Sequence, residues 1–97
     1  MHDEVVRNIV KTIVDGIKDA QMQYEYACDA KKAGEASIAK SHIDDASKRL
    51  DWVQAWYHKA EEMGAAKEKD GAVADALMWH YKDWYRMLKA KVAEFKV

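Results

Sequence analysis

Hydrophobic residues recur along this chain at alternating spacings of three and four positions, which is typical of amphipathic helices. Such spacings line one side of a helix because about 3.6 residues complete a turn. The pattern predicts helices over residues 3–32, 36–63 and 71–96. The stripe of the first helix consists of Val6, Val10, Ile13, Ile17, Ala20, Tyr24 and Ala27. The second stripe consists of Ala36, Ala39, Ile43, Ala46, Leu50, Val53, Tyr57 and Ala60, and the third of Ala74, Leu77, Tyr81, Trp84, Leu88, Val92 and Phe95.

Proline is absent from the 97 residues, so nothing in the composition forces a helix to stop early. Glycine provides the breaks instead, at Gly34 and at the pair Gly64 and Gly71. Because the connections are short, consecutive helices are expected to be antiparallel. We therefore predict an all-α fold over residues 1–97, a single domain built as an up-down-up three-helix bundle with long helices. Two such units could pair into a larger bundle.

The predicted core is uneven along its length. Near Gly34 the second stripe is made of alanines, so the helices must approach closely there or larger side chains must fill the gap. An antiparallel arrangement brings Tyr24 and Phe95 to this end as candidate fillers. Gly16 lies in the middle of the first helix, where glycine costs about 1 kcal/mol relative to alanine. It indicates either a second close approach or a tolerated imperfection.

Several large apolar residues do not belong to the stripes. On a helical wheel Trp52 lies roughly 130° and Trp56 roughly 90° from the mean direction of the second stripe. Met63 shares their side, and Trp79 lies nearly opposite the third stripe. A tryptophan can lie flat across its own helix with the indole N–H in water, which is the simpler interpretation. The alternative is a second apolar surface that binds a partner, since aromatic residues and methionine are enriched at interfaces.

Charge and composition exclude several partner classes. Sixteen basic and seventeen acidic residues leave a net charge of −1, which favours neither nucleic acid nor an anionic membrane. A weaker nucleic-acid candidate lies near the C-terminus, where Arg86 and three lysines accompany the rings of Tyr85 and Trp79. The chain has one cysteine, Cys28, and no apolar run of the roughly 18 residues that a membrane span needs. We expect a soluble, cytoplasmic protein.

Histidine and carboxylate residues raise the possibility of a metal site. His42 with Asp45, His58 with Glu61 and His80 with Asp83 are spaced to point from one helix face. In helical character the chain is similar to ferritin-like proteins, which use E-x-x-H motifs on facing helices, but no E-x-x-H occurs here. Height matching along antiparallel helices selects four candidate ligands, namely Glu25, His42, Asp45 and Glu94. A histidine hydrogen-bonded at the edge of the core is the simpler explanation.

The remaining enzyme motifs are missing. The sequence contains no glycine-rich phosphate loop, G-x-S-x-G or C-x-x-C, and Cys28 beside the first stripe suits a small buried residue. We therefore predict a non-enzymatic protein interaction or assembly module, such as an adaptor, a structural component or an inhibitor, with no cofactor. It would bind a protein partner or a second copy of itself, as a homodimer, through Trp52, Trp56, Met63 and Trp79, with Arg49 and Lys59 as the polar rim. The alternative is a ferritin-like metal-binding or oxidoreductase bundle completed by dimerisation.

Overall fold

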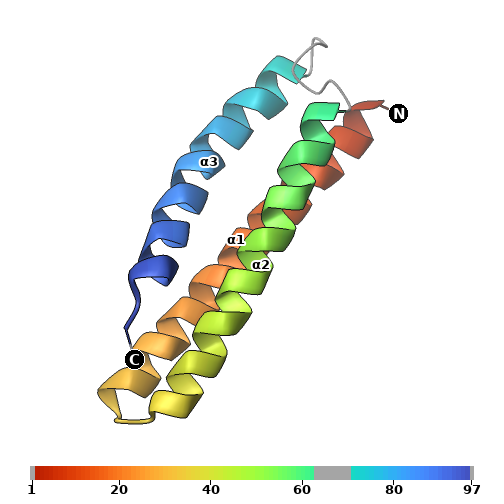
Figure 1. The fold of residues 1–97 in the computed structure, drawn as a ribbon. Helices are drawn as coiled ribbons and strands as arrows, with labels where there is room; N and C mark the ends of the chain where they lie inside the picture. The colour runs from red at the N-terminus through yellow and green to blue at the C-terminus, as the bar shows by residue number, and fades with distance from the viewer. Residues whose placement is uncertain (1, 63–70, 97) are drawn as a thin grey trace.

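A computed structural model describes residues 2–62 and 71–96, with side chains described for residue 4, residues 7–59 and residues 81–96. The described chain is all-α and contains three helices, α1 (His2–Lys32), α2 (Ala36–Glu62) and α3 (Gly71–Glu94) (Figure 1). The molecule is elongated, with extents of 51 × 19 × 16 Å. Its radius of gyration is 15.3 Å, whereas about 13 Å is usual for a compact chain of this length. No helix within the described ranges is long and apolar enough to cross a membrane.

The turn between α1 and α2 depends on Gly34. Its φ of +77° lies in the left-handed region, which a glycine adopts without the penalty that a β-carbon brings. The Gly34 N–H donates to the Lys31 carbonyl at 3.1 Å and the Glu35 N–H donates to the Ala30 carbonyl at 2.9 Å. These two bonds form a Schellman motif, which satisfies the last carbonyls of α1 and reverses the chain. The next helix then begins at Ala36 and runs back along α1.

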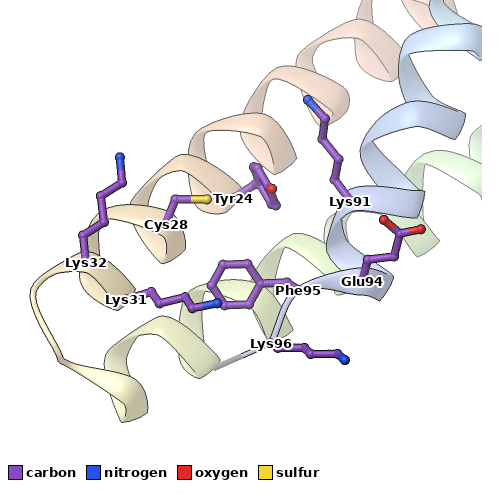
Figure 2. Close-up of a pocket in the computed structure, with 8 residues that line it drawn as sticks. All are labelled: Tyr24, Cys28, Lys31, Lys32, Lys91, Glu94, Phe95 and Lys96. Carbon is purple, nitrogen blue, oxygen red and sulfur yellow. The ribbon is translucent and has the colours of Figure 1, made fainter.

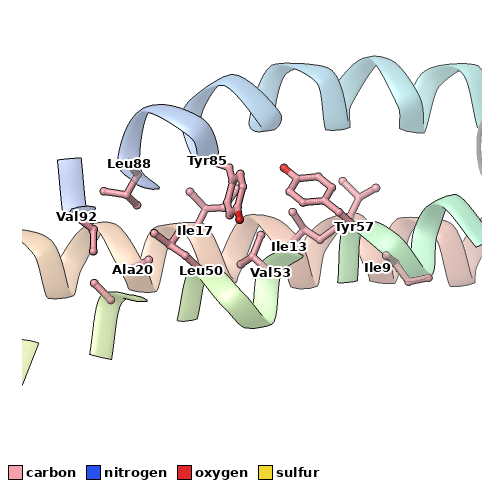
Figure 3. Close-up of a cluster of buried hydrophobic side chains, with 12 residues drawn as sticks. Ile9, Ile13, Ile17, Ala20, Leu50, Val53, Tyr57, Tyr85, Leu88 and Val92 are labelled. Carbon is pink, nitrogen blue, oxygen red and sulfur yellow. The ribbon is translucent and has the colours of Figure 1, made fainter. Parts of the chain in front are cut away.

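The core lies mainly between α1 and α2, which pack along most of their length as an antiparallel hairpin (Figures 1 and 3). Aliphatic side chains from both stripes meet there, and Ile13, Ile17, Leu50 and Val53 are among the largest fully buried ones, together with Leu88 of α3. The predicted stripes of the first two helices are confirmed at their central positions. The buried cluster comprises Ile9, Val10, Ile13, Ile17, Ala20, Ala46, Leu50, Val53, Tyr57, Tyr85, Leu88 and Val92.

The third helix contacts the hairpin less extensively than α1 and α2 contact each other. The ring of Tyr85 meets that of Tyr57 on α2 edge to face, with the centroids 5.6 Å apart, and the Tyr85 hydroxyl donates to Gln54 Oε1 at 3.4 Å. The expected stripe of α3 is partly wrong, because Tyr85 is buried beside Leu88 and Val92 whereas Trp84 is only half-buried. This helix is rotated so that Tyr85 points inward, toward the ring of Tyr57 (Figure 3).

The end of the hairpin near Gly34 packs through small residues. Ala27, Ala30 and Ala39 are buried there, so the two helices approach closely without large side chains between them. Tyr24 and Phe95, the predicted fillers, pack edge to face beside this end with ring centroids 6.1 Å apart, but an open hollow remains next to them.

A buried hydroxyl group, that of Tyr57, lies where α2 meets Tyr85 of α3. Tyr57 is only 5% exposed, and its hydroxyl oxygen finds no hydrogen-bond partner among the described residues. Burial, with a smaller contribution from neighbouring Tyr85, raises the pKa of Tyr57 from 10.0 to about 12. The folded state therefore holds this phenol in its protonated form at pH values where the unfolded chain would ionise it.

We predict that Gly34→Ala lowers the free energy of unfolding by about 1 kcal/mol, because alanine is strained at positive φ. No side chain lies within 4 Å of the added methyl group, so the loss is conformational. Gly34→Asn should lose less, since asparagine tolerates the left-handed region better. Urea unfolding of both variants provides the measurement. Equal stability of wild type and Gly34→Ala would contradict this account of the turn.

Alkaline pH should destabilise the protein through Tyr57. Because the pKa of Tyr57 is higher when folded, its contribution to stability is complete below pH 10 and is lost as the pH rises toward about 12. Tyr57→Phe removes that ionisation and the unpaired hydroxyl, so its stability should fall less steeply over this interval. Urea unfolding at several alkaline pH values tests this, with Tyr26→Phe as a control on an exposed ring. Parallel pH profiles for wild type and Tyr57→Phe would show that Tyr57 is not responsible.

Candidate interaction surface

Trp52 lies on the side of the hairpin away from α3. Successive residues of a helix are about 100° apart, so Trp52 projects roughly 160° from Gln54, the residue that bonds to α3. The side chain is 48% exposed, yet it does not extend freely into solvent. A β-carbon built on Gly16 would lie 3.1 Å and 3.2 Å from two carbons of the indole, Cζ3 and Cε3. The ring therefore rests on the bare backbone of α1.

Trp56 extends the aromatic surface by one helical turn. Its ring centroid is 6.0 Å from that of Trp52, with the ring planes at 75°, and Trp56 is partly buried against the core cluster. Lys59 covers part of the same ring, with Nζ 5.1 Å from the Trp56 centroid. The two indoles are thus held by each other, by α1 and by a cation.

A groove with charged walls lies next to the rings. It encloses about 420 Å³ between α1 and α2 and is lined by Asp19, Asp45, Lys48, Arg49 and Trp52. Arg49 Nη1 lies 3.5 Å from Asp19 Oδ2, and both side chains are about half exposed, so this ion pair contributes little to stability. We call the surface made by these groups the tryptophan face; it consists of Asp19, Asp45, Lys48, Arg49, Trp52, Trp56 and Lys59.

The structure brings together four of the six residues predicted for an interaction surface, Arg49, Trp52, Trp56 and Lys59, as one stripe on α2. Met63 lies outside the described residues. Trp79 lies within α3, but the structure does not describe its side chain. The participation of these two residues stays a prediction.

The four predicted metal ligands occupy separate surroundings. His42 Nδ1 donates a hydrogen bond of 2.7 Å to Gln23 Oε1, and its ring lies 5.5 Å from that of Tyr26. Glu25 accepts a hydrogen bond from the Gln21 amide on its own helix. Asp45 lines the tryptophan face. Among the described side chains, no group of three or more His, Cys, Asp or Glu residues is arranged to hold a metal ion.

Glu94, the fourth of these ligands, lines an open hollow of about 700 Å³ between the end of α3 and α1 (Figure 2). The hollow also contains Tyr24, Cys28, Phe95 and four lysines. A hydrogen bond with the Cys28 side chain, together with burial, raises the pKa of Tyr24. Lys31 places Nζ 5.3 Å from the Phe95 centroid, whereas Lys32 and Lys91 direct their ammonium groups away from the rings (Figure 2). The lysines therefore do not converge on one point.

The C-terminal region does not present Tyr85, one of the two rings in the nucleic-acid hypothesis, and the side chain of the other, Trp79, lies outside the described residues. Tyr85 is 8% exposed, and its ring packs against Tyr57. Lys89 lies with Nζ 5.7 Å from the Tyr85 centroid, at the edge of the core. A base could not stack on a buried ring.

Two polar partners could not be identified from the sequence. Gln23 bonds to His42 and Asp19 pairs with Arg49, and each contact joins α1 to α2. Both residues lie among the many polar positions of α1, and no motif distinguishes them. Only the relative rotation and height of the two helices bring these pairs together.

No family model matches the chain, and no similar curated protein or solved structure was found.

We predict that Gly16→Ala destabilises the hairpin by about 1 to 3 kcal/mol, although alanine is the better helix former by about 1 kcal/mol. The new methyl group would lie 2.6 Å from Val53 Cγ2 and would also press on the Trp52 ring. Urea unfolding measures the loss. Val53→Ala removes the nearest atom, so Gly16→Ala should cost less in that background. A gain of stability from Gly16→Ala in the wild-type background would disprove the close approach.

Proposed function

We propose that this protein is a non-enzymatic helical interaction module that docks a helix of a protein partner on the tryptophan face. The observation that carries the proposal is the position of Trp52, half exposed yet held in place by Gly16 and Trp56. A ring that is already ordered loses little conformational freedom when a partner covers it. Large, preorganised aromatic side chains are the usual anchors of binding energy at protein interfaces.

The arrangement of helices favours a helix as the docking element. In the proposed unit, α3 closes one side of the α1–α2 hairpin to give an up-down-up three-helix bundle. The opposite side then has the place that a fourth helix occupies in a four-helix bundle. Along that side the rings of Trp52 and Trp56 form the centre, and Arg49 and Lys59 form a charged rim. An apolar centre with a polar rim is the usual anatomy of a specific interface.

The proposed role is that of an adaptor, a structural component or an inhibitor, each of which needs only such docking. We place this role in the cytoplasm, since a lone cysteine cannot form an intramolecular disulfide and reduced thiols are the rule there. The charged groups of the rim would set the orientation and selectivity of the partner more than its affinity.

Photo-crosslinking tests the proposed function directly. A benzophenone amino acid at Lys48, which lines the groove beside Trp52, should form adducts with a polypeptide when the protein is irradiated in its cells of origin. The same probe at Met87, a 54% exposed apolar residue of α3, is the matched control and should give few. Trp52→Ala/Trp56→Ala should remove the Lys48 adducts while the far-ultraviolet circular dichroism stays helical. Equal adducts from Lys48 and Met87, or adducts that survive the double substitution, would refute the proposed face.

A further inference from the structure

We infer that the helix docked on the tryptophan face is α2 of a second copy of this chain, antiparallel to the first and related to it by a two-fold axis beside Trp52. This inference rests on the proposed function, because it uses the same face. It adds the identity of the partner and the register of the two helices.

Two charged residues of the face, Asp45 and Lys59, lie the same number of residues before and after Trp52. Asp45 precedes Trp52 by seven residues and Lys59 follows it by seven. Seven residues make nearly two helical turns. The side chains of Asp45 and Lys59 therefore each project within about 20° of the direction of Trp52, from the same side of α2. Asp45 lines the groove beside Trp52, and Lys59 lies over the neighbouring Trp56 ring. A negative and a positive group thus stand at equal distances on either side of the central indole.

A two-fold axis beside Trp52 places the negative group of one copy opposite the positive group of the other. In an antiparallel pair, the residue a given number of steps before the axis lies opposite the residue the same number of steps after it in the other copy. Asp45 of each copy then meets Lys59 of the other, which gives two opposite-charge pairs. A parallel pair would place Asp45 against Asp45 and Lys59 against Lys59. The charges therefore select the antiparallel arrangement.

The other basic residues of the face, Lys48 and Arg49, are compatible with the same antiparallel register. Arg49 and Lys48 lie three and four residues before Trp52, opposite Ala55 and Trp56 of the second copy. No two like charges of α2 on this face meet across the axis. The small side chain of Ala55 leaves space beside the central indole, and the basic groups come close to an indole ring, which attracts cations. The face is self-complementary, as a two-fold interface requires.

Reciprocal charge reversal tests the inference. Sedimentation equilibrium of the full chain should show a transition from the mass of one chain to that of two as concentration rises. Asp45→Lys alone and Lys59→Asp alone should each weaken the dimer at least about tenfold, because each creates two like-charge contacts. Asp45→Lys/Lys59→Asp should restore wild-type association. An equal mixture of the two single variants should also dimerise, as a heterodimer, since both of its contacts again join opposite charges.

Three controls show whether a weakened dimer results from the proposed charge pairs, from loss of the fold or from loss of the aromatic contact. Asp44 is exposed, adjacent to Asp45 and directed about 100° away, so Asp44→Lys should leave dimerisation unchanged. All these positions are solvent-exposed, and circular dichroism checks that each variant remains helical. Trp52→Ala should weaken association regardless of the charges.

Three results would overturn the inference. The first is a wild-type chain that stays monomeric up to about 1 mM. The second is a dimer insensitive to both single reversals, and the third is a pair of weakened single variants that fail to associate when mixed. A monomer whose Lys48 probe still crosslinks a different polypeptide would leave the proposed function intact and eliminate only the second copy as its partner. Lys48 adducts with the mass of two chains would support both.

Discussion

The helices α1 and α2 approach closely at Gly16, where the absence of a side chain lets α2 lie against the backbone of α1. A β-carbon at this position would fall 2.6 Å from Val53 Cγ2, well inside van der Waals contact. Two neighbouring residues of α2 pack against Gly16. Val53 points into the core and is fully buried, whereas Trp52 lies on the solvent-exposed side of the hairpin. The same glycine thus sets the spacing of the hairpin and orients the ring of the candidate surface.

The two sides of this hairpin differ in what covers them. On one side α3 packs against the hairpin, more against α1 than against α2. It adds Leu88 and Val92 to the core, and the ring of Tyr85 meets that of Tyr57. On the other side Trp52 and Trp56 pack on each other and on α1. The Arg49 to Asp19 ion pair there is half exposed and contributes little free energy. The binding capacity of that side therefore resides in its rings, and its charges set orientation.

The smaller contact of α3 with the hairpin agrees with what its described side chains, residues 81–94, bury. The described part of α3 buries Tyr85, Leu88 and Val92, whereas α1 and α2 together bury a continuous series of isoleucine, valine, leucine and alanine residues. Buried apolar area is the main favourable term in folding, so the hairpin holds most of the described stabilisation. The buried hydroxyl of Tyr57, which has no hydrogen-bond partner among the described residues, lowers the free energy that the α2–α3 contact contributes to stability. The fold is accordingly an extensive helical hairpin with a third helix alongside.

The sequence alone determined the helical segments, the reversal at Gly34, the aliphatic stripes of the first two helices and the separation of Trp52 from Val53. These features are local, because they follow from the helical repeat and from the backbone freedom of glycine. Tertiary structure decided that Tyr85 rather than Trp84 is buried, that Gln23 is the partner of His42, and that the four histidine and carboxylate candidates do not meet. Those outcomes depend on how far each helix is rotated and shifted against its neighbours, and that is fixed by the packing of all the helices at once.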